Sequence, residues 1–178
     1  MAALYKLIAT PGRRIACLAG VIFALDQITK QIVLRTIPIS DEHTVIPGFF
    51  NLAHRANTGA AWSLFTGNNA VLAFVAIAAL VALVFTRQHF KAGTPAGQIA
   101  FGLIFGGICG NLADRLCRGA VVDFLHFYLQ RRGSFETFDF PAFNVADSAI
   151  CTGVGLIFLV TWKNEVNPVS APPPKTSP

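Results

Sequence analysis

The chain has 178 residues and a mean hydropathy of +0.55; 53% of its residues are hydrophobic and only 13% are charged. Soluble domains carry about 25% charged residues, so this composition excludes an ordinary soluble protein and indicates that lipid surrounds much of the chain. The net charge is +5, but the basic residues stand beside apolar runs. That placement favours anionic lipid headgroups over nucleic acid as the partner.

Four apolar segments approach the length of about 20 residues that a helix needs to cross about 30 Å of hydrocarbon. They cover residues 15–34, 70–85, 97–112 and 145–162. The first follows basic residues, as a signal peptide would, but no small-residue cleavage site clearly follows it, so we interpret it as a retained membrane helix. The third contains small residues that would permit close helix contact, or would simply be tolerated in a membrane helix: Gly102, Gly106, Gly107 and Gly110.

The sequence therefore predicts an all-α membrane protein with four transmembrane helices and a small extracytoplasmic segment that is β-rich or interfacial. Two long connections, 35–69 and 115–143, alternate with the short link 86–96. Short strands or an interfacial segment are expected in the first, from apolar residues at Val45, Ile46, Phe49, Phe50 and Leu52. Residues 1–165 are expected to form one domain, and the Pro-rich tail 166–178 is expected to be disordered.

The orientation in the membrane follows from lysine and arginine in the connections. An even number of helices puts both termini on one side. The two tails and the short link hold seven Lys or Arg residues, and the two much longer connections hold six. The higher density favours cytoplasmic termini, with the long connections facing outward.

Ionisable residues inside the apolar segments need a reason, because a carboxylate at the centre of a membrane helix costs about 2.5–3.5 kcal/mol. Asp26 and Lys30 interrupt the first segment at i, i+4 spacing with the acid first, so they can pair on one helix face. Such a pair either anchors the helix end by neutralising itself or lines a functional site.

Three further polar residues, Asn111, Asp114 and Arg115, end the third segment on what we interpret as one helix face. An Asp114–Arg115 pair would cancel charge there, and we favour this structural role over direct chemistry.

Two more acids return to the outer edge of the apolar core. Asp123 stands in the apolar run GAVVDFLHF, which indicates a strand or a re-entrant segment. Asp147 stands at the third position of the fourth helix, which Asn144 can cap, so its ordinary interpretation is a capping-box acid. Two carboxyl groups that meet can share one proton, and one can then activate water while the other donates a proton. That is the chemistry of aspartic proteases.

Other site types find less support. The four histidines lack metal-ligand spacing and the four cysteines form no CxxC pair, so no metal, no cofactor and no disulfide framework is expected. Asn57 could be an ordinary turn residue. Two other functions stay open at this point: a proton-coupled transporter, because intramembrane acids occur on proton paths, and a purely structural assembly protein.

Five motifs together resemble the type II signal peptidases, the prolipoprotein signal peptidases of bacteria. They stand in the family's order, over about residues 15–162: DQxxK at Asp26–Lys30, NTGAAWS at Asn57–Ser63, GNLADR at Gly110–Arg115, VVDF at Val121–Phe124 and FNVADS at Phe143–Ser148. Between Asp123 and Asn144 the chain looks longer than the family norm.

The resemblance implies an intramembrane aspartic endopeptidase of the bacterial cytoplasmic (inner) membrane, with its active site at the extracytoplasmic face. Such an enzyme removes the signal peptide of a prolipoprotein just before the cysteine that carries diacylglycerol. A globomycin-type inhibitor and a monomeric state are expected, with membrane lipid as a further partner. The matching catalytic residues are Asp123 and Asp147. The matching supporting residues are Asp26, Lys30, Asn57, Asn111, Asp114, Arg115 and Asn144.

Overall fold

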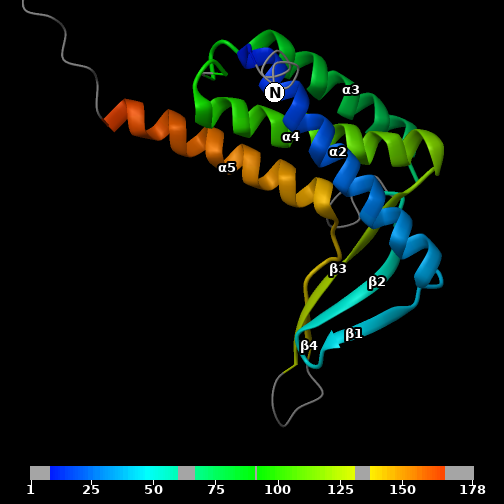
Figure 1. The fold of residues 1–178 in the computed structure, drawn as a ribbon. Coiled ribbons are helices and arrows are strands. Elements are labelled where there is room, and N and C mark those ends of the chain that lie inside the picture. Colours follow the sequence, from blue (N-terminus) through cyan, green and yellow to red (C-terminus); the bar gives the residue numbers. More distant parts are fainter. Residues whose placement is uncertain (1–8, 60–66, 91, 131–136, 167–178) are drawn as a thin grey trace, which may run out of the picture.

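A computed structural model describes residues 9–59, 67–90, 92–130 and 137–166 of the chain (Figure 1). Four helices in these ranges are long and apolar enough to cross a membrane, as predicted. They are α2 (Pro11–Thr36), α3 (Asn69–Thr86), α4 (Pro95–Cys117) and α5 (Val145–Val166). The predicted disordered tail falls almost wholly outside the described residues.

Helix α4 ends five residues later than the sequence predicted. The apolar stretch predicted an end at residue 112, whereas α4 continues to Cys117. The extension contains Asp114, which lipid would disfavour, but the Asp114 side chain is fully buried inside the protein. Because its partners are protein groups rather than lipid, the helix can continue past the point where hydropathy falls.

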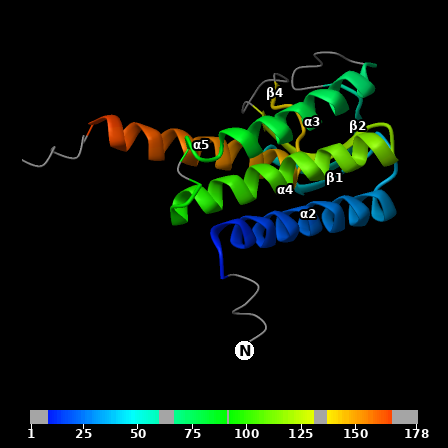
Figure 2. The ribbon, with the colours of Figure 1, turned by 90° about the horizontal axis from the view of Figure 1, so that it is seen from above.

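Helix α4 is the centre of the bundle and packs against the other three helices. In Figure 2 it lies between α2 on one side and α3 and α5 on the other. Its glycines permit this approach, since a Cβ on Gly102 or Gly106 would lie 2.7 Å from an atom of Leu18 or Ala19 in α2. The close-contact interpretation of the glycine pattern is therefore confirmed.

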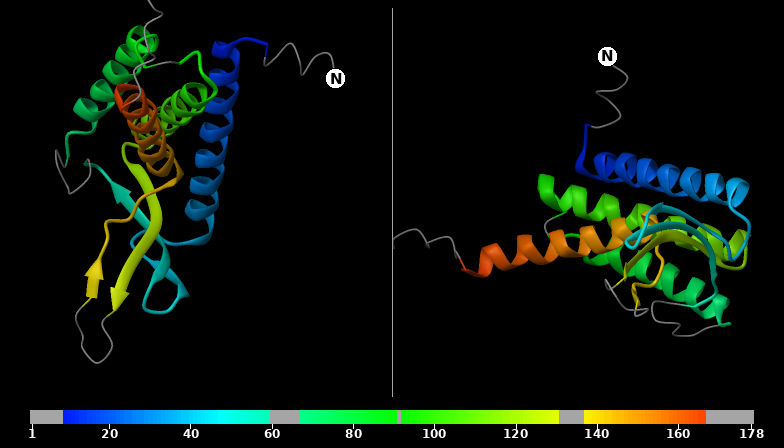
Figure 3. Two further views of the ribbon diagram at one scale, coloured as in Figure 1. Left: turned by 90° about the vertical axis from the view of Figure 1, so that its left-hand side faces the viewer. Right: turned by 90° about the horizontal axis from the view of Figure 1, so that it is seen from below.

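A four-stranded antiparallel sheet lies at the end of the bundle where α2 and α4 end and α3 and α5 begin (Figure 3). Its strands, in spatial order, are β1 (Glu42–Ile46), β2 (Phe50–Asn57), β3 (Val121–Gln130) and β4 (Thr137–Asp139). The prediction of a small β-rich segment is confirmed. The stretch between Asp123 and Asn144 supplies the end of β3 and all of β4, and its residues 131–136 lie outside the described ranges.

The register makes the sheet two-faced. Phe50 pairs with Phe127, and Leu52 pairs with Leu125. Cross-strand partners share a face, so one face is apolar. Asn51 pairs with His126 on the alternate positions, and the side chain of Glu42 reaches both, so the other face is polar.

We expect Gly107→Ala to destabilise the protein. The new Cβ would lie 2.5 Å from the carbonyl oxygen of Ala146 in α5, a backbone atom that cannot move without shifting that helix. Overpacking of this kind costs about 1–3 kcal/mol, so the melting temperature in detergent should fall. Gly155→Ala is the matched control, because nothing lies within 4 Å of its Cβ position. Equal melting temperatures for the two variants would contradict the close-packing argument.

Candidate active site

Asp123 and Asp147 come from different elements that backbone pairing brings together. Asp123 is the third residue of β3 and only 3% exposed. The segment before α5 is bound to β3 through Phe143, whose carbonyl accepts from the amides of Phe124 (3.0 Å) and Leu125 (2.8 Å). This pairing places Asn144, and then the first turn of α5 with Asp147, beside the start of β3.

Asn144 joins the two carboxyl groups directly. Its Nδ2 donates to Oδ1 of Asp123 at 2.7 Å. Its Oδ1 accepts from the backbone amide of Asp147 at 2.9 Å, and the backbone amide of Asn144 donates to Oδ2 of Asp147 at 3.1 Å. The last two bonds form the predicted capping box. One asparagine therefore serves both as a helix cap and as the bridge between the two acids.

Two more amides complete the hydrogen bonding of these carboxyl groups. Asn111 Nδ2 donates to Oδ1 of Asp147 at 2.7 Å, and Asn111 Oδ1 accepts from Asn144 at 3.1 Å. Asn57 Nδ2 donates to Oδ2 of Asp123 at 2.8 Å. The interpretation of Asn57 as only a turn residue is too narrow, although its Oδ1 does hold the turn through the Gly59 amide at 2.9 Å.

The electrostatics favour a bound proton on Asp123. Burial, and then the neighbouring carboxyl group of Asp147, raise the pKa of Asp123 from an ordinary 3.8 to about 7. Hydrogen bonds from Asn57 and Asn144 and the charge of Lys30 act in the opposite direction. Because burial and the carboxyl group of Asp147 raise the pKa of Asp123 to about 7, the two acids can keep one proton between them near neutral pH.

A fully buried ionic cluster lies behind the two acids. Lys30 Nζ is 2.8 Å from Oδ2 of Asp26 and 2.8 Å from Oδ2 of Asp114, and it donates to Asn111 Oδ1 at 2.9 Å. The predicted Asp26–Lys30 pair is present. It is not self-contained, because Asp114 shares the lysine and Asn111 links it to Asp147.

The predicted Asp114–Arg115 pair is wrong. Successive helix residues point about 100° apart, whereas residues four apart lie over one another. Asp114 accordingly pairs with Arg118, which stands at i+4. Arg115 instead donates to the carbonyls of Gly59 at 3.2 Å and Asn111 at 3.4 Å. The same acid-first spacing that revealed Asp26 and Lys30 would have found Arg118.

Gln27 is a second residue that the sequence interpretation did not single out. Its Nε2 donates to Oδ2 of Asp26 at 3.1 Å and to Oδ1 of Asp114 at 3.1 Å.

Within the described ranges, no three His, Cys, Asp or Glu side chains are grouped so that they could hold a metal ion. The groups gathered at this site are carboxyl, amide, ammonium and guanidinium groups.

The family model for signal peptidase (SPase) II matches residues 18–163. A lipoprotein signal peptidase of Syntrophotalea carbinolica is 36% identical over 159 residues, covering 86% of this chain and 94% of the relative. That of Desulforapulum autotrophicum is 42% identical over 146 residues, covering 79% and 86%, and that of Bacillus subtilis is 33% identical over 142 residues, covering 80% and 88%.

Solved structures agree with the sequence comparisons. A bacterial membrane enzyme determined by the in meso method at 2.3 Å resolution superposes with a TM-score of 0.76 at 33% identity, covering 89% of this chain and 93% of that one. The resemblance predicted from the five motifs is confirmed. Four helices able to span a bilayer fit a multi-pass protein of the bacterial inner membrane. The chain belongs to the signal peptidase II family, the lipoprotein signal peptidases, which are proteases that process bacterial prolipoproteins.

Proposed function

We propose that Asp123 and Asp147 are the catalytic pair of an aspartic endopeptidase that cleaves prolipoproteins just before the diacylglyceryl-modified cysteine. The observation that carries this proposal is that one buried residue, Asn144, donates to both carboxyl groups: its side-chain amide donates to Asp123 and its backbone amide donates to Asp147. Family membership favours this function over the transporter and the assembly protein.

The chemistry requires one water molecule and one proton shared by the two acids. One aspartate takes a proton from the water while the water oxygen forms a bond to the scissile carbonyl carbon. The other aspartate donates its proton to the carbonyl oxygen. When the tetrahedral intermediate collapses, the carbon–nitrogen bond breaks and the leaving nitrogen takes up the proton that the first aspartate removed from water. The hydroxyl group formed from the carbonyl oxygen returns a proton to the second aspartate, which restores the starting state of the pair. The products are the signal peptide with a free carboxyl group and the lipoprotein with a free amino group on its modified cysteine.

The seven supporting residues divide into two groups. Asn57, Asn111 and Asn144 orient the carboxyl groups by direct hydrogen bonds. The others act on the backbone around the site. Asp26 accepts from the Ala146 amide, and Asp114 accepts from the Val122 amide. Lys30 forms ion pairs with both Asp26 and Asp114. Arg115 donates to the Gly59 carbonyl.

The sheet end of the bundle faces the extracytoplasmic side in this proposal, and the termini are cytoplasmic. Arg13 and Arg14 at the start of α2, and Arg87 after α3, stand at the opposite end, and the higher density of basic residues there favours a cytoplasmic location for that end. The signal helix of the substrate enters laterally from the bilayer, so that its acyl chains stay in lipid while the scissile bond reaches the pair. A globomycin-type cyclic peptide would occupy the same site, and the chain acts as a monomer.

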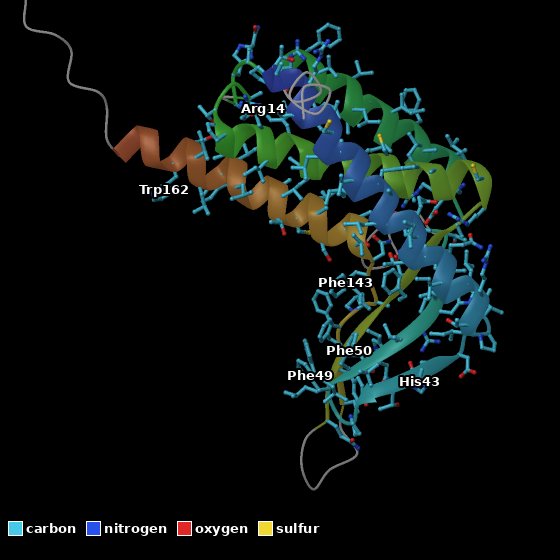
Figure 4. All side chains as sticks on the ribbon, viewed as in Figure 1. Arg14, His43, Phe49, Phe50, Phe143 and Trp162 are labelled. Carbon is cyan, nitrogen blue, oxygen red and sulfur yellow. The ribbon has the colours of Figure 1, made fainter. Side chains whose placement is uncertain are left out.

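Membrane lipid is a further partner, through the apolar face of the sheet. Aromatic rings pack along this face, from Phe50 through Phe127 and Phe143 to Phe140. In Figure 4, Phe49, Phe50 and Phe143 lie on the side of the sheet beneath α5, the side toward which the helices extend. That face therefore looks back toward the bilayer, where aromatic residues are favoured at the interface.

Asp123→Asn and Asp147→Asn should each lower the cleavage rate of a diacylglyceryl-modified prolipoprotein by at least about 10²- to 10⁴-fold, the contribution of a positioned acid or base. Both proteins should still insert into membranes, because asparagine keeps the shape of the side chain. Asp41→Asn, which changes an exposed acid directly before β1, is the control and should cleave normally. Normal cleavage by either site variant would refute the proposed pair, and ion flux through liposomes without cleavage would favour a transporter.

The raised pKa of Asp123 predicts a specific pH dependence of stability. Between about pH 4 and about pH 7 the folded protein keeps a proton on Asp123 that the unfolded chain has lost. The contribution of this group to stability is fully present below pH 4 and is lost as the pH rises to 7. The melting temperature of the native protein minus that of Asp123→Asn should therefore fall across this window. A difference independent of pH would contradict the raised pKa.

Neighbouring positions on β4 test the lipid contact of the sheet. Phe138 pairs with Leu129 on the apolar face, and Asp139 pairs with Tyr128 on the other. In proteoliposomes, Phe138→Trp should add fluorescence that brominated lipid quenches, whereas the matched control Asp139→Trp should add fluorescence that aqueous iodide quenches. Quenching of both by iodide alone would show that the sheet stands clear of the membrane.

A further inference from the structure

The two buried acids of the ionic cluster hold the backbone at equivalent places. Asp26 Oδ1 accepts from the amide of Ala146 at 2.9 Å, and Asp114 Oδ2 accepts from the amide of Val122 at 3.2 Å. Each amide belongs to the residue directly before one of the proposed catalytic aspartates. Because Lys30 binds both acids, the cluster determines where α5 starts relative to β3, and hence how the two carboxyl groups meet.

The charges of this cluster do not balance within the bundle. Asp26 and Asp114 carry two negative charges, and Lys30 carries one positive charge; all three side chains are fully buried. An uncompensated buried charge is strongly unfavourable. The second cation that forms an ion pair with the cluster is Arg118, whose guanidinium pairs with Oδ1 of Asp114 and whose side chain is 28% exposed.

Arg118 reaches the cluster together with Gln27. Its Nη1 donates to Gln27 Oε1 at 3.0 Å, and Gln27 Nε2 donates to Oδ1 of Asp114 and also to the Gly110 carbonyl at 3.2 Å. Asp114 therefore has two differently used oxygens. Oδ1 is held by Arg118 and Gln27, which leaves Oδ2 for Lys30 and the Val122 amide.

We propose that Arg118 and Gln27 are positioning residues for the catalytic pair: by fixing Oδ1 of Asp114, they aim Oδ2 at the Val122 amide and so set the position of Asp123. The proposal rests on the catalytic assignment of Asp123 and Asp147. Neither residue is bonded to those two carboxyl groups in the described part of the chain, so both act through Asp114. Without the outer donors, the Asp114 carboxylate can rotate and the start of β3 loses a fixed support.

Kinetics of Arg118→Ala, Arg118→Lys and Gln27→Leu on a lipidated prolipoprotein test this inference. Misplacement of a reacting group by about 1 Å can cost up to about 10²-fold in rate, so Arg118→Ala should lower kcat about tenfold or more while KM stays within about twofold. Arg118→Lys restores the charge and a donor and should recover most of kcat. Gln27→Leu keeps the volume without the hydrogen bonds and should lower kcat in the same way.

Arg35→Ala is the matched control, since Arg35 is an exposed arginine in the last turn of α2, at the same end of the bundle. It should leave kcat and KM unchanged. Arg118→Ala with native kcat, or with kcat lost and not recovered by lysine, would overturn the inference. If Arg118→Ala does not fold, native kcat in Gln27→Leu would overturn it equally. Asp123→Asn and Asp147→Asn in the same assay separate the two proposals. Normal cleavage by either of these variants would refute the catalytic pair, whereas the results for Arg118 and Gln27 test only the positioning role.

Discussion

The whole site depends on one buried ammonium group. Lys30 lies between Asp26 and Asp114 at 2.8 Å from each and is fully buried with them. A lone charge in this place would be very costly, so the two helices that supply its partners, α2 with Asp26 and α4 with Asn111 and Asp114, have to pack in one arrangement. In a bilayer, where the apolar surfaces of helices gain little from meeting one another, such polar contacts specify the fold more strongly than apolar area does.

The glycines of α4 make this arrangement possible. They bring α2 and α5 so close that a single Cβ would collide with backbone or with Asp26. Close helices allow short side chains such as aspartate and asparagine to reach across the bundle. Long side chains could span a wider bundle, but their greater rotamer freedom would position the two carboxyl groups less sharply.

The environment of Asp123 follows from the same packing. Burial raises its pKa, while two asparagine amides and Lys30 limit the rise to a value of about 7. An acid in this range can hold or release a proton at physiological pH, as an acid–base catalyst must. The sheet extends from the pair with one apolar face, which carries the Phe50–Phe127 and Leu52–Leu125 pairs, and one polar face, which carries Glu42, Asn51 and His126.

Local patterns in the sequence determined the four helices, the strand-forming connection, the Asp26–Lys30 pair and the five family motifs. Hydropathy, caps and i, i+4 spacing act within a few residues, so the chain alone reveals them. The tertiary structure decided which distant groups meet. Lys30 and Asn111 are 81 positions apart, and Ala146 bonds to Asp26 across 120 positions. Such partners depend on how helices pack, which is why the sequence paired Asp114 with its neighbour Arg115, and the folded protein pairs it with Lys30 and Arg118.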